Sequence, residues 1–312
     1  MNVGPVVVGV DNTIDACSAV MWAAQEAALA QTSLLIVHSF QLPSAKATGG
    51  YLSPVPRDCD DVGHSVLRDL AALAQAAQPD VVISTLLSHA DPAQALISLS
   101  AQARLLVLGS RSAVTEELPL LASKRTLITA RAHCPVLLLG PISTFDSPRE
   151  ISRVVVGVAA TRAARAAVEF ATIEAVRREV TLHLVRVEPE SGAQLSERAT
   201  GPGKEHVPMP QPMDSLSAEA REINRNYPGL TVLADPAIGY AAESLLSYSD
   251  SSSILVVGCR HSDDRWSTRL GAVTTSVVHR NRGPVVIVGF AHDAEGPRSD
   301  MASADRGSLL IL

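Results

Sequence analysis

The stretch VVVGVDN at residues 6–12 decides the fold, because the chain repeats it as VVVGVAA at residues 154–160. Two further pairs recur at nearly the same spacing: LLVLGSR at 105–111 with ILVVGCR at 254–260, and CPVLLLG at 134–140 with GPVVIVG at 283–289. Three aliphatic segments that return 148 or 149 residues later predict a chain built from two similar halves.

Each half alternates short apolar runs with longer helical stretches. In the first half we expect strands at 6–10, 34–39, 80–87, 105–108 and 136–139, and helices at 15–30, 64–77, 91–103 and 122–132. In the second half we expect strands near 153–158, 180–187, 229–234, 253–257 and 284–288, and helices near 161–177, 214–226, 237–249 and 271–281. Regular alternation predicts an α/β fold with parallel sheets, right-handed crossovers and helices on both faces.

Composition agrees with this class. The chain has 312 residues, of which 46% are hydrophobic and only 3% aromatic, so its cores must be aliphatic, as in parallel sheets covered by helices. In such sheets ligands bind at the carboxyl ends of the strands, where the winding reverses. The informative loops are therefore those after strands one, two and four of each half.

Several functional classes are disfavoured. The net charge is −6 and no stripe of Lys and Arg is interleaved with aromatics, so we expect no nucleic-acid partner. No apolar stretch approaches the roughly 18 to 20 residues of a membrane span, and no secretory leader is recognisable. The four scattered cysteines, none in a CxxC pair, indicate reduced thiols and a cytoplasmic location: Cys17, Cys59, Cys134 and Cys259.

Segments without an apolar period mark the expected boundaries. We predict a first domain at 1–140, a linker at 141–152 and a second domain at 153–289. The residues from 290 to 312 are expected to form a mobile tail. Two polar stretches rich in Pro and Gly, at 41–63 and 188–213, are interpreted as surface loops or lids after the second strand of each half.

Together, the strand VVVGVDNT, the segment LLVLGSR before a helix and the closing HCPVLLL resemble the universal stress protein domain. The resemblance covers about residues 3–140 and 152–289, so the chain is similar to tandem members of that family. It implies two doubly wound five-stranded parallel sheets of order 3-2-1-4-5, whose fifth strands pair two domains within a chain or between chains. A pseudo-dimer within this chain, and a homodimer of it, are both expected on that basis.

The resemblance also implies a function. Some members bind ATP through an Asp after strand one and a loop of the form G-x2-G-x9-G-[ST], and catalysis in the family is weak or absent. In the first half this implies a site made of Gly9, Asp11, Ser39, Gly109, Ser112, Ala122 and Ser123. Asp11 would contact the ribose or adenine, although an Asp before Asn12-Thr13 also suits a turn or helix cap.

The phosphate loop of the first half keeps its length but not its composition. Ser112 and Ala122 replace two glycines, and a Cβ at a position that needs positive φ costs about 1 kcal/mol or more. Glu116 and Glu117 would repel phosphates, which nearby basic residues would offset: Arg111, Lys124 and Arg125. ATP or another adenine nucleotide is therefore a candidate ligand of this half.

The second half departs further from the pattern. Its weaker site would comprise Gly157, Val187, Gly258 and Gly271, but Ala159 replaces the acidic residue. His261 stands for the second glycine, Ala272 for the hydroxyl residue, and the loop carries Asp263 and Asp264. Two carboxylates near a triphosphate are unfavourable without a cation.

Two main hypotheses follow. The first is a non-enzymatic cytoplasmic stress-response protein that binds an adenine nucleotide in its first domain. The alternative is a degenerate tandem domain that binds no nucleotide and acts as a protein-interaction scaffold. An enzyme is the least favoured interpretation, since the chain has no Walker lysine loop, HExxH or nucleophile elbow, and no metal site is expected.

Overall fold

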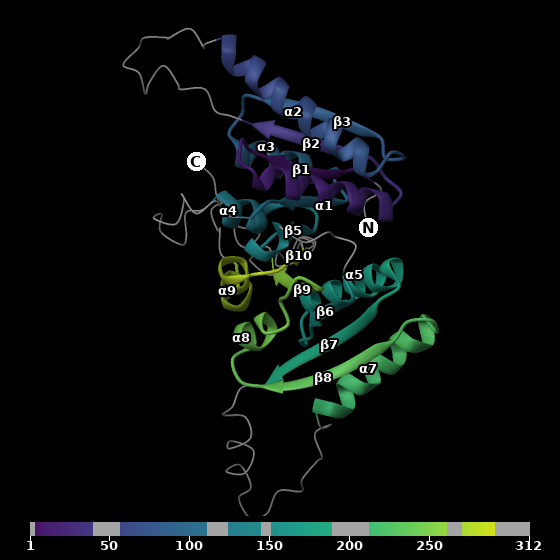
Figure 1. Ribbon diagram of the computed structural model, residues 1–312. Helices are drawn as coiled ribbons and strands as arrows, with labels where there is room; N and C mark the ends of the chain where they lie inside the picture. Colours follow the sequence, from purple (N-terminus) through teal and green to yellow (C-terminus); the bar gives the residue numbers. More distant parts are fainter. Residues whose placement is uncertain are drawn as a thin grey trace, which may run out of the picture.

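The computed structural model describes residues 4–39, 57–110, 124–144, 151–188, 212–260 and 270–290 (Figure 1). The first half contains β1 (Val6–Val10), α1 (Asp15–Leu29), β2 (Leu34–Ser39), α2 (Arg57–Ala77), β3 (Ile83–Ser88), α3 (Pro92–Ser100), β4 (Leu105–Leu108), α4 (Lys124–Arg131) and β5 (Val136–Leu138). The short 3-10 helix η2 (Pro141–Thr144) follows. The second half contains β6 (Arg153–Gly157), α5 (Arg162–Arg178), β7 (Thr181–Glu188), α7 (Pro212–Asn226), β8 (Val232–Ile238), α8 (Ala241–Leu246), β9 (Ser253–Arg260), α9 (Ala272–Arg280) and β10 (Val285–Phe290).

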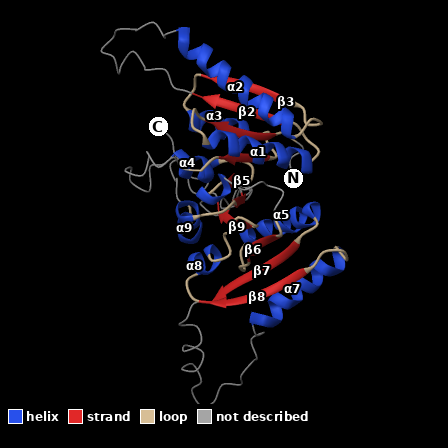
Figure 2. Ribbon diagram, viewed as in Figure 1, coloured by secondary structure: helices blue, strands red, loops and turns tan. Residues whose placement is uncertain are grey.

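All ten strands belong to one sheet, in the order β3-β2-β1-β4-β5-β10-β9-β6-β7-β8. Within each half the strands are parallel and follow the expected order 3-2-1-4-5, which confirms the α/β doubly wound fold. The two fifth strands pair antiparallel, with Leu138 opposite Val285 and Val136 opposite Ile287. The two expected sheets are therefore joined edge to edge within one chain (Figure 2).

Alternation along the strands builds two aliphatic layers. Val6 and Val8 point to one face and belong to the layer that includes residues of α1, α2, α5 and α7. Val7 points to the other face and belongs to the layer that includes residues of α3, α4, α8 and α9. Both layers continue from the first half into the second. Full burial of one such side chain contributes about 1.5 to 3 kcal/mol, so the continuous core holds the halves together.

The junction is also joined by polar contacts. The indole nitrogen of the buried Trp22 donates a hydrogen bond to the carbonyl oxygen of Ser143, at 3.2 Å. Ile142 donates its backbone N–H to the carbonyl oxygen of Arg282 in the second half, at 3.1 Å. Helix η2 is thus attached to both halves.

The loop expected at 41–63 is wrong in part. Helix α2 begins at Arg57, so residues 57–63 are helical. Gly63 favours a loop in the sequence, yet it faces β3, where the Cδ1 atom of Leu87 would lie 2.7 Å from a Cβ built on it. The glycine therefore permits close packing of helix on strand.

Other boundaries shift by a few residues. Strands β3 and β8 begin three residues later than expected, at Ile83 and Val232, and α8 is limited to Ala241–Leu246. Asp91 caps α3 as expected, accepting hydrogen bonds from the N–H groups of Ala93 and Gln94. Residues 40–56, 189–211 and 291–312 lie outside the described residues. No helix in the described ranges has the length and apolarity needed to cross a membrane.

Candidate functional site

A pocket of about 180 Å³ lies at the carboxyl ends of β1, β2 and β4. Its lining residues are Gly9, Val10, Asp11, Thr13, Asp15, Ala16, Ala19, Val37, Ser39, Pro92, Leu96, Gly109 and Ser110. Strand β1 leads to α1 on one face of the sheet and β4 leads towards α4 on the other, so a crevice opens between the two strands. The pocket thus lies where the topology of the sheet predicts a ligand site.

Asp11 forms a turn at the floor of this pocket. Its Oδ1 atom accepts hydrogen bonds from the backbone N–H of Thr13 at 3.0 Å and from the Thr13 hydroxyl at 2.5 Å. The N-cap of α1 is Ile14, so Asp11 has the turn role but not the helix-cap role that its sequence context also allows. The exposed carboxylate uses one oxygen for this turn, and the other remains available to a ligand.

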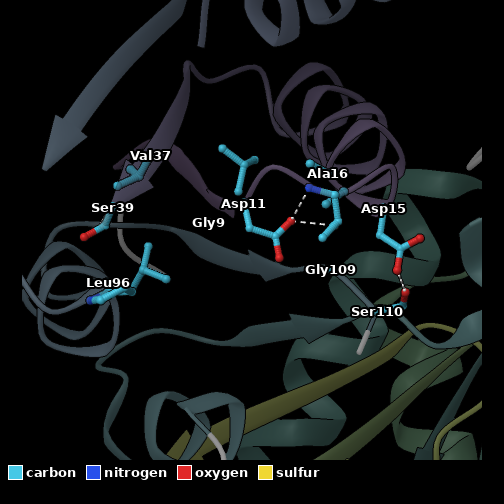
Figure 3. A pocket seen from close by; sticks show the side chains of 13 residues that line it. Gly9, Asp11, Asp15, Ala16, Val37, Ser39, Leu96, Gly109 and Ser110 are labelled. Carbon is cyan, nitrogen blue, oxygen red and sulfur yellow. Dashed lines mark hydrogen bonds between the residues drawn. The ribbon is translucent and has the colours of Figure 1, made fainter. Parts of the chain in front are cut away.

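Figure 3 shows the Asp11 side chain between two groups of pocket residues. On one side lie Ser39, Val37 and Leu96. The Ser39 hydroxyl donates to the carbonyl oxygen of Ala90 at 2.7 Å, which connects β2 to the loop before α3. Ser39 therefore borders the pocket with its backbone and β-carbon, while its hydroxyl is engaged elsewhere.

On the other side lie Asp15 and Ser110 (Figure 3). The Ser110 hydroxyl donates to Oδ2 of Asp15 at 2.5 Å, which joins the exit of β4 to the first turn of α1. Thr13, Asp15 and Ser110 are absent from the set of residues that the sequence predicts for the site. The Asp-x-Thr spacing of a turn and an acidic residue in the first helical turn are the signals that could have identified two of them.

The glycines of the first half have different roles. A Cβ on Gly9 would lie 2.6 Å from Cδ1 of Leu96, so this glycine lets the Leu96 side chain of α3 pack closely on β1. A Cβ on Gly109 would instead make ordinary contacts, 3.6 Å from Cβ of Ala19 and 3.9 Å from the carbonyl oxygen of Asp15. The described protein around Gly109 leaves room that a ligand could use.

The second half lacks that room. A Cβ on Gly258 would lie 2.3 Å from the carbonyl oxygen of Ala163 and 2.8 Å from the amide nitrogen of Ala164. Ala163 corresponds to Asp15 in the repeat, so the first turn of α5 lies closer to its strand than the first turn of α1 does. The start of α5 closes the crevice at this point, and Gly258 is required by that packing.

The other expected residues of the second half have roles in packing and helix capping. Gly157 packs under α8, because a Cβ there would lie 3.0 Å from Cδ1 of Leu245. Val187 is part of β7 and packs partly buried against the aliphatic core. Gly271 is the N-cap of α9 without a side-chain cap, and Thr161 caps α5 by accepting a hydrogen bond from Ala164.

Two basic residues expected beside the phosphate loop, Arg125 and Lys124, have partners within the protein. Arg125 donates from Nη1 to the carbonyl oxygen of Gly109 at 2.9 Å and from Nη2 to that of Leu139 at 3.0 Å. The Lys124 ammonium lies 3.8 Å from the carboxylate of Asp91. Both cations thus have partners within the described structure, and the charged side chains among the described lining residues are the two aspartates. Their expected role in offsetting repulsion at the phosphate loop stays a prediction.

Several residues discussed for the two sites lie outside the described residues: Arg111, Ser112, Glu116, Glu117, Ala122, Ser123, His261, Asp263 and Asp264. Within the described ranges, no group of three or more His, Cys, Asp or Glu side chains could hold a metal ion.

The three cysteines whose side chains the structure describes do not line this pocket. Cys17, Cys134 and Cys259 are free thiols. Burial raises the pKa of Cys134 to about 12 and also raises the pKa of Cys259. These two thiols stay protonated at neutral pH and are poor nucleophiles.

Comparison with known proteins gives universal stress proteins as similar proteins. Residues 2–140 match the model of the universal stress protein family. Universal stress protein Rv2005c of Mycobacterium tuberculosis is 26% identical over 290 residues, covering 90% of this chain and 96% of the relative. Universal stress protein Rv2623 of the same organism is 28% identical over 287 residues, covering 90% and 95%. A universal stress protein of Archaeoglobus fulgidus has a crystal structure that matches with a TM-score of 0.69 at 16% identity, over 93% of this chain and 99% of that chain.

Proposed function

Since residues 2–140 match the model of the universal stress protein family, we propose that the first half of the chain binds an adenine nucleotide in the pocket beside Asp11 and that the second half binds none. The function proposed is ligand binding in a cytoplasmic stress response, without a catalytic step. The observation that supports it most directly is the pocket at the divergence of β1 and β4, which offers a carboxylate, exposed backbone and an apolar wall at one place.

Each part of the adenosine would have a matching group. The second oxygen of Asp11, which the turn does not use, would accept hydrogen bonds from the ribose hydroxyls, and the backbone near Val37 and Ser39 would face the edge of the adenine. The apolar wall formed with Leu96 and Pro92 suits the faces of the base. The space beside Gly109 would admit the first phosphate.

Charge favours a nucleotide with few phosphates. Asp11 and Asp15 both line the pocket, and the described lining contains no basic side chain. Each added phosphate therefore meets repulsion unless residues 111–123 contribute cations. We expect AMP and adenosine to bind at least as well as ATP.

The test uses the full-length protein. Freshly purified protein is denatured, the released small molecules are separated by chromatography, and calorimetric titrations with ATP, AMP and adenosine follow on the nucleotide-free protein. Release of an adenine nucleotide, or measurable heat with one of these ligands, is expected. Absence of both would overturn the proposal and favour the scaffold hypothesis. Cell fractionation and light scattering would test the cytoplasmic location and the homodimer.

A further inference from the structure

A hydrogen-bond network connects the pocket of the first half to the second half. Arg125 lies at its centre, on α4. Besides its bond to Gly109, which lines the pocket, its Nη2 atom donates to Oδ1 of Asn281 at 3.4 Å. Asn281 is the C-cap of α9, so one guanidinium contacts the pocket wall and the end of a helix from the other half.

Asn281 is itself held firmly. Its side chain is buried, and its Nδ2 atom donates to the carbonyl oxygens of Gly283 at 3.0 Å and Leu138 at 3.4 Å. The turn that it begins packs closely on the first half, since a Cβ on Gly140 would lie 1.9 Å from the carbonyl oxygen of Arg282. Asn281 therefore presents its acceptor to Arg125 from a fixed position.

The repeat keeps a hydrogen bond to the glycine carbonyl but not the link between the two halves. The residue of the second half that corresponds to Arg125 is Thr274, whose hydroxyl lies 3.5 Å from the carbonyl oxygen of Gly258. The residue of the first half that corresponds to Asn281 is Ala132, which has no polar side chain. The two halves thus differ at both positions, and the long-range link serves only the half that has the open pocket.

We propose that Arg125 and Asn281 are positioning residues that fix the peptide of Gly109, so that the second half supports the ligand site of the first. This inference rests on the proposed nucleotide site for its functional consequence. The second half then has a specific role, because it holds the exit of β4 in the geometry that a phosphate-bearing ligand needs. A fork-shaped guanidinium suits this arrangement because it donates to several acceptors in one plane.

Variants Asn281→Ala and Asn281→Ser remove the acceptor for Arg125, the second retaining a small polar group in case the first is poorly stable. Arg125→Lys replaces the guanidinium, which donates to several acceptors, with a single ammonium group. The matched control is Arg280→Ala, because Arg280 is the adjacent residue but its contact, with Glu243 at 3.5 Å, stays within the second half. Hydrogen exchange of the peptide covering residues 105–110 is measured without ligand, and affinities for AMP and adenosine are measured by calorimetry.

We expect faster exchange at residues 109–110 in the Asn281 variants than in Arg280→Ala. AMP affinity should fall about 5-fold, the equivalent of one hydrogen bond, with a smaller loss for adenosine. Arg125→Lys should lose about 10-fold or more. Unchanged AMP affinity in all three variants overturns the inference, even where exchange rises. If the wild-type protein binds no nucleotide, the proposed function fails, whereas faster exchange confined to the Asn281 and Arg125 variants still supports the positioning role.

Discussion

Arg178 on α5 donates a hydrogen bond to the carboxylate of Glu26 on α1, so the two halves of the chain share a buried ion pair. The side chains are only 4% and 6% exposed. Arg178 also donates from Nε to Glu174 at 3.0 Å. Glu26 and Glu174 occupy corresponding positions of the repeat, so one arginine serves the two related carboxylates at the junction.

This cluster predicts a pH-dependent stability. Burial raises the pKa of Glu26 from 4.5 to about 7, Arg178 opposes this rise, and Glu174 adds to it. Because the folded state holds the proton more tightly than the unfolded chain, the stabilising contribution is complete below about pH 4.5 and is lost as the pH rises through about 7. Urea unfolding across this window should show a decline of a few kcal/mol at most, at about 1.4 kcal/mol per pKa unit.

Glu26→Gln should flatten this decline, since glutamine does not titrate. Glu243→Gln is the control, because Glu243 forms an exposed pair with Arg280 and should leave the pH profile unchanged. A decline of the same size in the wild type and in Glu26→Gln would assign it to other groups.

Removal of the shared Arg178 should lower the free energy of unfolding. Arg178→Met leaves Glu26 and Glu174 buried without their common partner, and we expect a loss of about 3 to 5 kcal/mol in the free energy of unfolding at neutral pH. Adding Glu26→Gln to that variant should restore part of the loss, because it removes one uncompensated charge. If the double variant is no more stable than Arg178→Met, the loss comes from packing instead.

Gly109 and Gly258, which occupy corresponding positions of the repeat, should respond differently to substitution by alanine. Gly258→Ala places a Cβ 2.3 Å from a backbone oxygen of α5, so we expect a loss of roughly 1 to 3 kcal/mol or more in thermal or urea unfolding. Gly109→Ala has room and should leave stability nearly unchanged, while it weakens nucleotide binding measured by calorimetry. Equal destabilisation by both substitutions would contradict the difference between the halves.

The acidic position provides a second comparison. Asp11→Ala should weaken adenosine and AMP binding about 10-fold, the usual loss for a hydrogen bond to a charged group. Ala159→Asp should create no second site, because the start of α5 still closes the crevice beside Gly258. Calorimetry measures the number of ligands bound per chain. A rise from one to two ligands in Ala159→Asp would show that the missing carboxylate alone prevents binding in the second half.

The sequence predicted the fold well where the signal is local. Short aliphatic segments such as Val6–Val10 and Leu105–Leu108 form strands as expected, because a segment that is apolar at successive positions suits a strand buried on both faces of a parallel sheet. Asp91-Pro92 fixed the start of α3 for a similar local reason. The start of α2 was missed because Gly63 carries a loop signal locally, and its packing partner Leu87 lies on another element.

The site was predicted less completely, since its chemistry depends on contacts between distant segments. Asp11, Ser39 and Gly109 line one pocket. The hydrogen bond between Ser110 and Asp15 and the one from Arg125 to Gly109 could not be foreseen, because each joins residues that are far apart in the chain.

By itself, the sequence determined that the chain is a repeated α/β unit with strands in a set order, because apolar periodicity is a property of neighbouring residues. Only the tertiary structure decided that β5 and β10 join the halves into one sheet, that α5 closes the second crevice while α1 leaves the first open, and that Arg125 reaches Asn281. The physical reason is distance. The first backbone oxygen of α1 lies 3.9 Å from the Cβ position of Gly109 and leaves room for a ligand, whereas the corresponding oxygen of α5 lies 2.3 Å from that of Gly258 and leaves none, and a closely packed interior does not adjust easily.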